Sequence, residues 1–171
     1  SRLLLVGGGP EEDALRRTAR DAGVADRVLF AGERPYASDR APGPDLAQGP
    51  RLAPDPDLPD LTSAMDVFAS PSAEEAFGLA VVEALAAGLP GLYSACPAVE
   101  DLPSAAAPGA RRVEGGADAY AEALAAARAA GPGPRSAPDA ARHYCITRSA
   151  AQLMDVYAAA LATTPQGAST P

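Results

Sequence analysis

Residues 70–90 constrain the fold of this chain more than any other stretch; they read SPSAEEAFGLAVVEALAAGLP. The apolar run from Asp66 to Ser70 predicts a short strand that leads into a polar turn. The turn opens a helix, which we expect to begin at Phe77 and Gly78 and to end at Gly88-Leu89-Pro90. A strand, a turn and a helix in this order form the repeating unit of α/β folds.

The mouth of this helix and two nearby carboxylates indicate a ligand site. The first backbone N–H groups of a helix have no partner within it and carry partial positive charge. Gly78 has no side chain, so a phosphate can approach the backbone closely there. Glu75 and Glu83 are eight positions apart, and helical geometry returns that spacing to within about 80° of its starting direction, so both can face one site. The alternative is that Glu75 is an ordinary first-turn acid and that Glu83 points to solvent.

The pattern P-S-x-x-E-A-F-G-L-x-x-x-E-A-L-A-x-G-L-P in this stretch resembles the signature of the retaining glycosyltransferases of family 4, which have the two-Rossmann-domain GT-B fold. The resemblance implies that Glu75 is the catalytic residue beside the donor sugar. It also implies that Glu83 binds the ribose hydroxyls of a nucleotide-diphosphate donor of the UDP or GDP type. The resemblance also assigns donor binding to Ser72 in this turn. It implies that the backbone of Phe77, Gly78 and Leu79 holds the diphosphate.

A second glycine turn lies near the start of the chain. Leu3 to Val6 reads as a buried strand, Gly7-Gly8-Gly9-Pro10 as a tight turn, and Glu11 to Ala22 as a helix. The glycines lack the spacing of the dinucleotide fingerprint, so by themselves they predict an ordinary strand-to-helix turn. The resemblance instead places Gly7, Gly8 and Gly9 at the edge of the donor cleft.

The rest of the chain continues the alternation of strands and helices. Pro35 to Pro59 is rich in Pro, Asp, Gly and Ala, and we expect this insertion to be poorly ordered. Thr147 is a plausible N-cap for a long last helix, whose apolar positions Ala150, Leu153, Met154, Tyr157 and Leu161 predict a buried stripe. The other expected elements are strands at Asp26 to Gly32, Gly91 to Ser94 and Arg111 to Val113, helices at Leu58 to Ala64, Ala98 to Leu102, Asp118 to Ala130, Asp139 to Tyr144 and Thr147 to Ala162, and a disordered tail at 163–171.

Composition and charge exclude several other classes of protein. The net charge of −8 argues against binding to nucleic acid, and no apolar run approaches the roughly 18 residues of a membrane span. Cys96 and Cys145 have no metal-ligand spacing, and we expect free thiols in a cytoplasmic protein. There is no Walker loop, zinc cluster or aspartate pair for two metals, and His143, the only histidine, reads as structural. The resemblance likewise implies metal-independent chemistry without a cofactor.

These patterns predict an α/β fold with a doubly wound, Rossmann-like parallel sheet and a long C-terminal helix, the C-terminal half of a GT-B fold. We expect residues 1–162 to form one nucleotide-sugar-binding domain, with the acceptor, which is unknown, bound by an N-terminal Rossmann-like domain in cis that this sequence lacks. The first donor-domain strand, with its Arg and Lys, is also missing, so we expect a fragment that is inactive alone. We expect that the complete enzyme can associate peripherally with a membrane. The alternatives are a truncated, non-catalytic nucleotide-binding or protein-interaction module, and an unrelated doubly wound nucleotide-binding domain.

Overall fold

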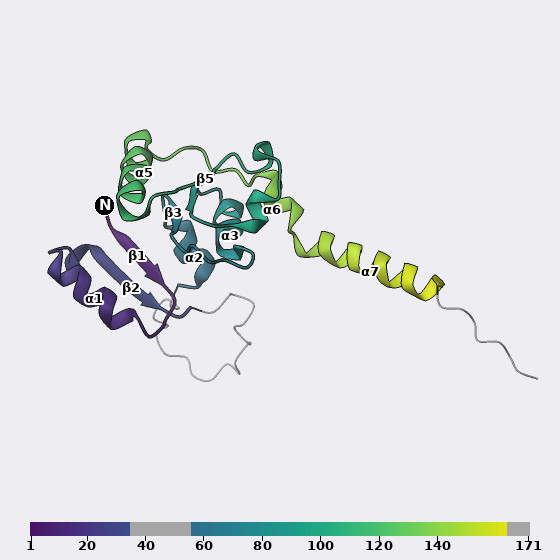
Figure 1. The fold of residues 1–171 in the computed structure, drawn as a ribbon, viewed down its shortest axis with the longest axis horizontal. Helices are drawn as coiled ribbons and strands as arrows, with labels where there is room; N and C mark the ends of the chain where they lie inside the picture. Colours follow the sequence, from purple (N-terminus) through teal and green to yellow (C-terminus); the bar gives the residue numbers. More distant parts are fainter. Residues whose placement is uncertain (35–55, 164–171) are drawn as a thin grey trace, which may run out of the picture. The chain divides into compact units, whose positions relative to one another are not determined.

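The computed structural model describes residues 1–34 and 56–163 (Figure 1). The chain divides into two compact units, Ser1–Met65 and Asp66–Pro171, and each has its own parallel sheet. The predicted α/β class with parallel strands and a long C-terminal helix is confirmed. That residues 1–162 form one domain stays a prediction.

The first unit is a pair of parallel strands with a helix packed beside it (Figure 1). β1 (Leu3–Val6) pairs with β2 (Val28–Gly32), and α1 (Glu12–Asp21) followed by the short 3-10 helix η1 (Ala25–Arg27) connects them. The Arg16 guanidinium of α1 lies 4.0 Å from the centroid of the Phe30 ring, so α1 covers the sheet face that carries Phe30.

Residues 35–55 of the predicted insertion Pro35 to Pro59 lie outside the described residues. The structure describes its last residues, 56–59. Asp57 caps α2 (Leu58–Ser63): its carboxylate accepts the Asp60 N–H at 3.0 Å, and the Asp60 carboxylate accepts the Asp57 N–H at 3.2 Å. Two otherwise unpaired N–H groups are satisfied by this reciprocal capping box. The expected insertion therefore overlaps α2 at Leu58 and Pro59.

The second unit is built on a sheet with the parallel order β3-β4-β5. Phe68 of β3 lies opposite Gly91 of β4, and Gly91 lies opposite Ala110 of β5. The elements of this unit are β3 (Phe68–Ser70), α3 (Leu79–Ala86), β4 (Gly91–Tyr93), α4 (Pro97–Glu100), the 3-10 helix η3 (Ser104–Ala106), β5 (Ala110–Arg112), α5 (Gly116–Ala130), α6 (Asp139–His143) and α7 (Ile146–Thr163). The predicted elements are thus present, with bounds that differ by at most two residues.

Strand β4 is buried on both of its faces. Successive side chains of a strand point to opposite faces, and here Tyr93 joins one core cluster while Leu92 joins another. The first cluster contains Val81, Val82 and Leu85 of α3 together with Cys96 and Val99, and the second contains Val113 with Tyr120 and Ala123 of α5. Helices on both faces of a parallel sheet are what a doubly wound fold requires.

The predicted buried stripe on the last helix is wrong. Leu153, Met154, Tyr157 and Leu161 of α7 are all exposed, Leu161 to 77%. Apolar residues at helical spacing show that a helix has an apolar face, but the spacing does not supply a surface to cover it. Thr147 is also not the N-cap, because α7 begins at Ile146; Thr163 is its last residue, and the rest of the predicted tail lies outside the described residues.

Candidate functional site

The turn between β3 and α3 ends in a glycine that no other residue can replace without strain. Gly78 is the N-cap of α3, is buried, and has φ of +92°, which is the left-handed region. A Cβ atom at this position would overlap the Cys96 sulfur and lie 3.2 Å from the Cys96 Cβ. The glycine of the signature is therefore fixed both by its backbone angle and by the close approach of Cys96.

The N-terminus of α3 is open to an anion. Val81 and Val82 donate their N–H groups to the Gly78 carbonyl at 3.1 and 3.2 Å. Within the described part of the chain, the N–H groups of Leu79 and Ala80 make no hydrogen bond, and both residues are exposed. The first turn of α3 contains no acidic residue that would oppose the positive end of the helix dipole.

Glu75 lies in the turn and not in the helix. Because α3 begins at Leu79, the helical angle that we used to relate Glu75 to Glu83 does not apply, and that part of the prediction is wrong. The Glu75 side chain is exposed, and its Oε1 accepts a long hydrogen bond from the Phe77 N–H at 3.4 Å. The Ser72 hydroxyl donates to the Glu74 carbonyl at 2.8 Å, which shapes the same turn. The catalytic role of Glu75 and the donor-binding role of Ser72 stay predictions.

Glu83 lies in the middle of α3 between two buried residues, Val82 and Ala84. It is half-buried. Its place on the helix that follows the Gly78 turn is consistent with the predicted contact to a ribose. That contact stays a prediction.

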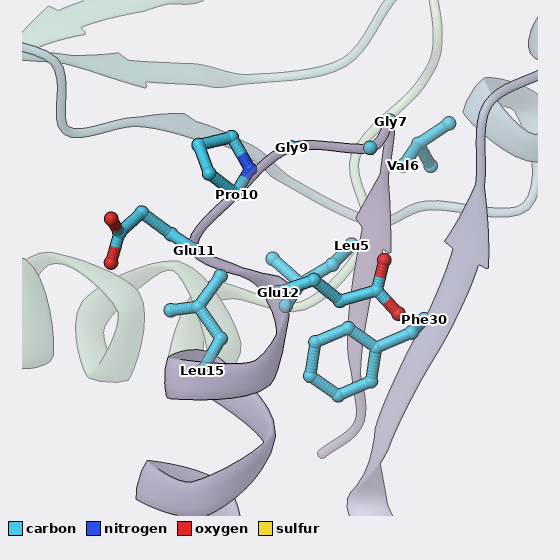
Figure 2. A pocket seen from close by; sticks show the side chains of 10 residues that line it. Leu5, Val6, Gly7, Gly9, Pro10, Glu11, Glu12, Leu15 and Phe30 are labelled. Atoms are coloured by element: carbon cyan, nitrogen blue, oxygen red, sulfur yellow. The ribbon is translucent and has the colours of Figure 1, made fainter.

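The first glycine turn lines a hollow of about 300 Å³ in the first unit. Figure 2 shows Leu15 and Phe30 beside the turn that runs from Gly7 to Pro10. Gly7 has φ of +115° and donates its N–H to the Gly32 carbonyl at 2.9 Å, so this N–H is already used. The full lining is Leu5, Val6, Gly7, Gly8, Gly9, Pro10, Glu11, Glu12, Leu15 and Phe30.

The charge around this hollow differs from that around the α3 N-terminus. Glu12 and Asp13 occupy the first turn of α1, and Glu12 pairs with Arg16 at 2.7 Å. Acidic groups at a helix N-terminus oppose a phosphate, so this turn suits a neutral ligand group better than a diphosphate. Gly7, Gly8 and Gly9 belong to the first unit and the other predicted site residues to the second.

Several residues that sequence reasoning missed lie around the turn between β3 and α3. Cys96 is fully buried, and burial raises the pKa of its thiol; burial also raises the pKa of the Tyr144 phenol. The Tyr120 hydroxyl donates to the Ser70 carbonyl at 2.8 Å and lies 3.0 Å from the Ser94 hydroxyl, which ties together the ends of β3 and β4. No local pattern marks these residues, because their partners are distant in sequence.

A parallel sheet with helices on both faces, and with a glycine turn that opens a helix beyond the end of a strand, defines an α/β domain of the Rossmann type. The chain belongs to the family Glycosyl transferases group 1, whose model matches residues 1–129. The family predicted from the signature at residues 71–90 is thereby confirmed.

The similar proteins include enzymes and solved structures that are much longer than this chain. The GDP-mannose-dependent alpha-(1-6)-phosphatidylinositol monomannoside mannosyltransferase of Mycobacterium tuberculosis is 36% identical over 95 residues, which are 52% of this chain and 20% of that enzyme. The sucrose-phosphate synthase of Thermosynechococcus elongatus superposes with a TM-score of 0.66 at 23% identity, covering 95% of this chain and 39% of that one. HepE of Anabaena, solved with UDP and glucose, gives a TM-score of 0.63 at 20% identity over 92% of this chain and 40% of that one. The solved relatives have the GT-B fold, which confirms the predicted fold class.

Two further observations concern metals and membranes. Among the residues that the structure describes, no three His, Cys, Asp or Glu side chains gather as a metal site requires. Within the same residues, none of the helices combines the length and the apolar character that crossing a bilayer demands.

Proposed function

We propose that this chain is the donor-binding part of a retaining glycosyltransferase, which takes a sugar from a nucleotide-diphosphate donor of the UDP or GDP type. The diphosphate binds the backbone at Phe77, Gly78 and Leu79. Glu83 accepts hydrogen bonds from the ribose hydroxyls, and Glu75 lies beside the sugar. Ser72 adds a further donor contact in this turn, and the role of Gly7, Gly8 and Gly9 at the edge of a donor cleft stays a prediction.

The observation that carries this proposal is the open N-terminus of α3 behind Gly78. Two N–H groups that make no hydrogen bond within the described residues, those of the exposed residues Leu79 and Ala80, coincide there with the positive end of the helix dipole and with a residue that has no Cβ. The acidic first turn of α1 makes the other glycine turn a poor phosphate site by comparison. The comparison of the two first turns therefore favours α3 for the diphosphate.

This chain spans 20% of the mannosyltransferase and about two fifths of the two solved structures. We propose that an N-terminal Rossmann-like domain in cis binds the acceptor and that transfer needs both domains, without a metal or a cofactor. The mannosyltransferase is named for a phosphatidylinositol mannoside, so peripheral contact of a complete cytoplasmic enzyme with a membrane is part of this proposal.

A calorimetric titration of the chain with UDP, GDP and ADP tests the donor site. We expect saturable binding of UDP or GDP, and Glu83→Ala should weaken it by about tenfold to a hundredfold, because hydrogen bonds to a charged group contribute about 1.5–3 kcal/mol. Glu122→Ala, which removes an exposed glutamate of α5, is the matched control and should bind like the original chain.

Each result of the titration has a definite meaning. Equal affinity of the Glu83→Ala variant would remove the ribose role of Glu83. Absence of binding to all three nucleotides would refute the donor site in this chain and favour the alternative of a protein-interaction module. Glu75→Ala should retain affinity for the nucleoside diphosphate, since its carboxylate is assigned to the sugar and not to the nucleotide.

A further inference from the structure

The turn that presents α3 is bonded to the segment that follows β4. The Phe77 carbonyl accepts the Ala98 N–H at 2.9 Å. The Cys96 sulfur lies 3.8 Å from the same carbonyl and 3.7 Å from the Gly78 carbonyl, within reach of S–H hydrogen bonds. The inner side of the turn is therefore attached to residues 96–98.

Tyr144 contacts both partners of the Phe77–Ala98 hydrogen bond. Its ring meets the Phe77 ring edge-on, with centroids 5.0 Å apart and an interplanar angle of 81°. Its hydroxyl donates to the Ala98 carbonyl at 2.8 Å. Tyr144 follows α6, which packs against α3, so one side chain braces the turn, its anchor and the helix behind them.

We propose that Tyr144 is a positioning residue, which holds the Phe77–Gly78 turn in the conformation that aims the Leu79 and Ala80 N–H groups at a donor diphosphate. This inference rests on the proposed function of the turn. Donors that are already fixed before the ligand arrives need no ordering on binding, so affinity rises with the rigidity of the turn. Residues 71–77 are exposed, and the contacts from Ala98 and Tyr144 supply the rigidity that burial does not.

A purely structural role for Tyr144 makes a different prediction. If Tyr144 only anchored α6, removing its hydroxyl would lower the stability of the unit without changing the turn. Tyr144→Phe keeps the ring against Phe77 and removes only the bond to the Ala98 carbonyl. The single substitution therefore separates the two roles, provided that the turn is observed directly.

Cys96 reports on the turn directly, because its thiol is fully buried beneath Gly78. In a Cys145→Ser background, which removes the exposed thiol, the alkylation rate of Cys96 by a maleimide measures how often the turn opens. We expect Tyr144→Phe to raise this rate and to weaken UDP or GDP binding, each by about twofold to tenfold, the range that one hydrogen bond supports.

Two control variants complete the experiment. Tyr157→Phe removes a hydroxyl from an exposed tyrosine of α7 and should change neither the alkylation rate nor the affinity. Val113→Ala destabilises the second core cluster, away from the turn, and shows how much alkylation a general loss of stability produces.

The inference is overturned if Tyr144→Phe alkylates no faster than the original chain, or no faster than Val113→Ala at equal loss of stability. It is also overturned if the turn opens faster while the affinity stays the same. Failure of the proposed function looks different: the original chain then binds neither nucleotide, and the alkylation rates alone decide whether Tyr144 holds the turn.

Discussion

Replacing Gly78 by alanine tests whether the turn is as tightly fixed as its geometry indicates. The left-handed backbone costs a residue with a Cβ about 1–2 kcal/mol. Overlap with the Cys96 sulfur destabilises the folded state by about a further 1–3 kcal/mol. The alanine also lowers the conformational entropy of the unfolded chain, which offsets about 0.4–1 kcal/mol of this loss. We therefore expect Gly78→Ala to lower the free energy of unfolding by about 1–5 kcal/mol.

Gly116→Ala is the matched control for this substitution. Gly116 also has a positive φ, of +74°, but a Cβ there would meet no atom within 4 Å. The difference between the two variants isolates the overlap with Cys96. Both lie in the second unit, so urea unfolding followed by circular dichroism reports the same transition for both.

A double substitution makes the test sharper. Cys96→Ala removes the sulfur that the new methyl group would strike, so Gly78→Ala should cost less in that background than in the original chain. Equal losses for Gly78→Ala and Gly116→Ala, with no coupling to Cys96, would refute the reasoning that close packing under the turn requires the glycine.

Three further predictions concern stability and can be measured by urea unfolding. Burial raises the pKa of the Cys96 thiol and of the Tyr93 phenol above their ordinary values of 9.0 and 10.0. Because these groups then ionise at lower pH in the unfolded chain than in the folded one, the free energy of unfolding should fall as the pH rises above about 9. A flat profile of the free energy of unfolding from pH 8 to 11 would contradict this. Asp57→Ala should destabilise the first unit by about 1 kcal/mol through loss of the capping box, whereas Asp57→Asn should recover most of it. Leu85→Ala should cost about 2–5 kcal/mol because Leu85 is 1% exposed, while Leu161→Ala should change stability by less than about 0.5 kcal/mol; a large effect at Leu161 would show that α7 is covered.

The sequence predicted the local structure of this chain well. Strands were recognised from short apolar runs, and helices from their spacing and from glycines such as Gly88, which has φ of +74° just beyond α3. These signals act over a few residues, so they can be read without knowing the fold. The family signature added the fold class and the candidate residues, and the match to Glycosyl transferases group 1 confirmed the family.

The parts that sequence reasoning missed depend on contacts between distant segments. The angle between Glu75 and Glu83 was taken from helical spacing, yet the Phe77–Gly78 turn is bonded to Ala98, and α3 starts only at Leu79. The apolar positions of α7 were expected to be buried, but periodicity carries no information about a covering surface.

The sequence by itself therefore determined the elements, the α/β class and the glycine that opens α3. Only the tertiary structure decided why that glycine is required and what holds it: Cys96 beneath it, and Tyr144 bonded to Ala98 across 46 positions of the chain. The physical reason is that backbone preferences are local, whereas the packing that fixes a turn comes from whichever segments the fold brings together.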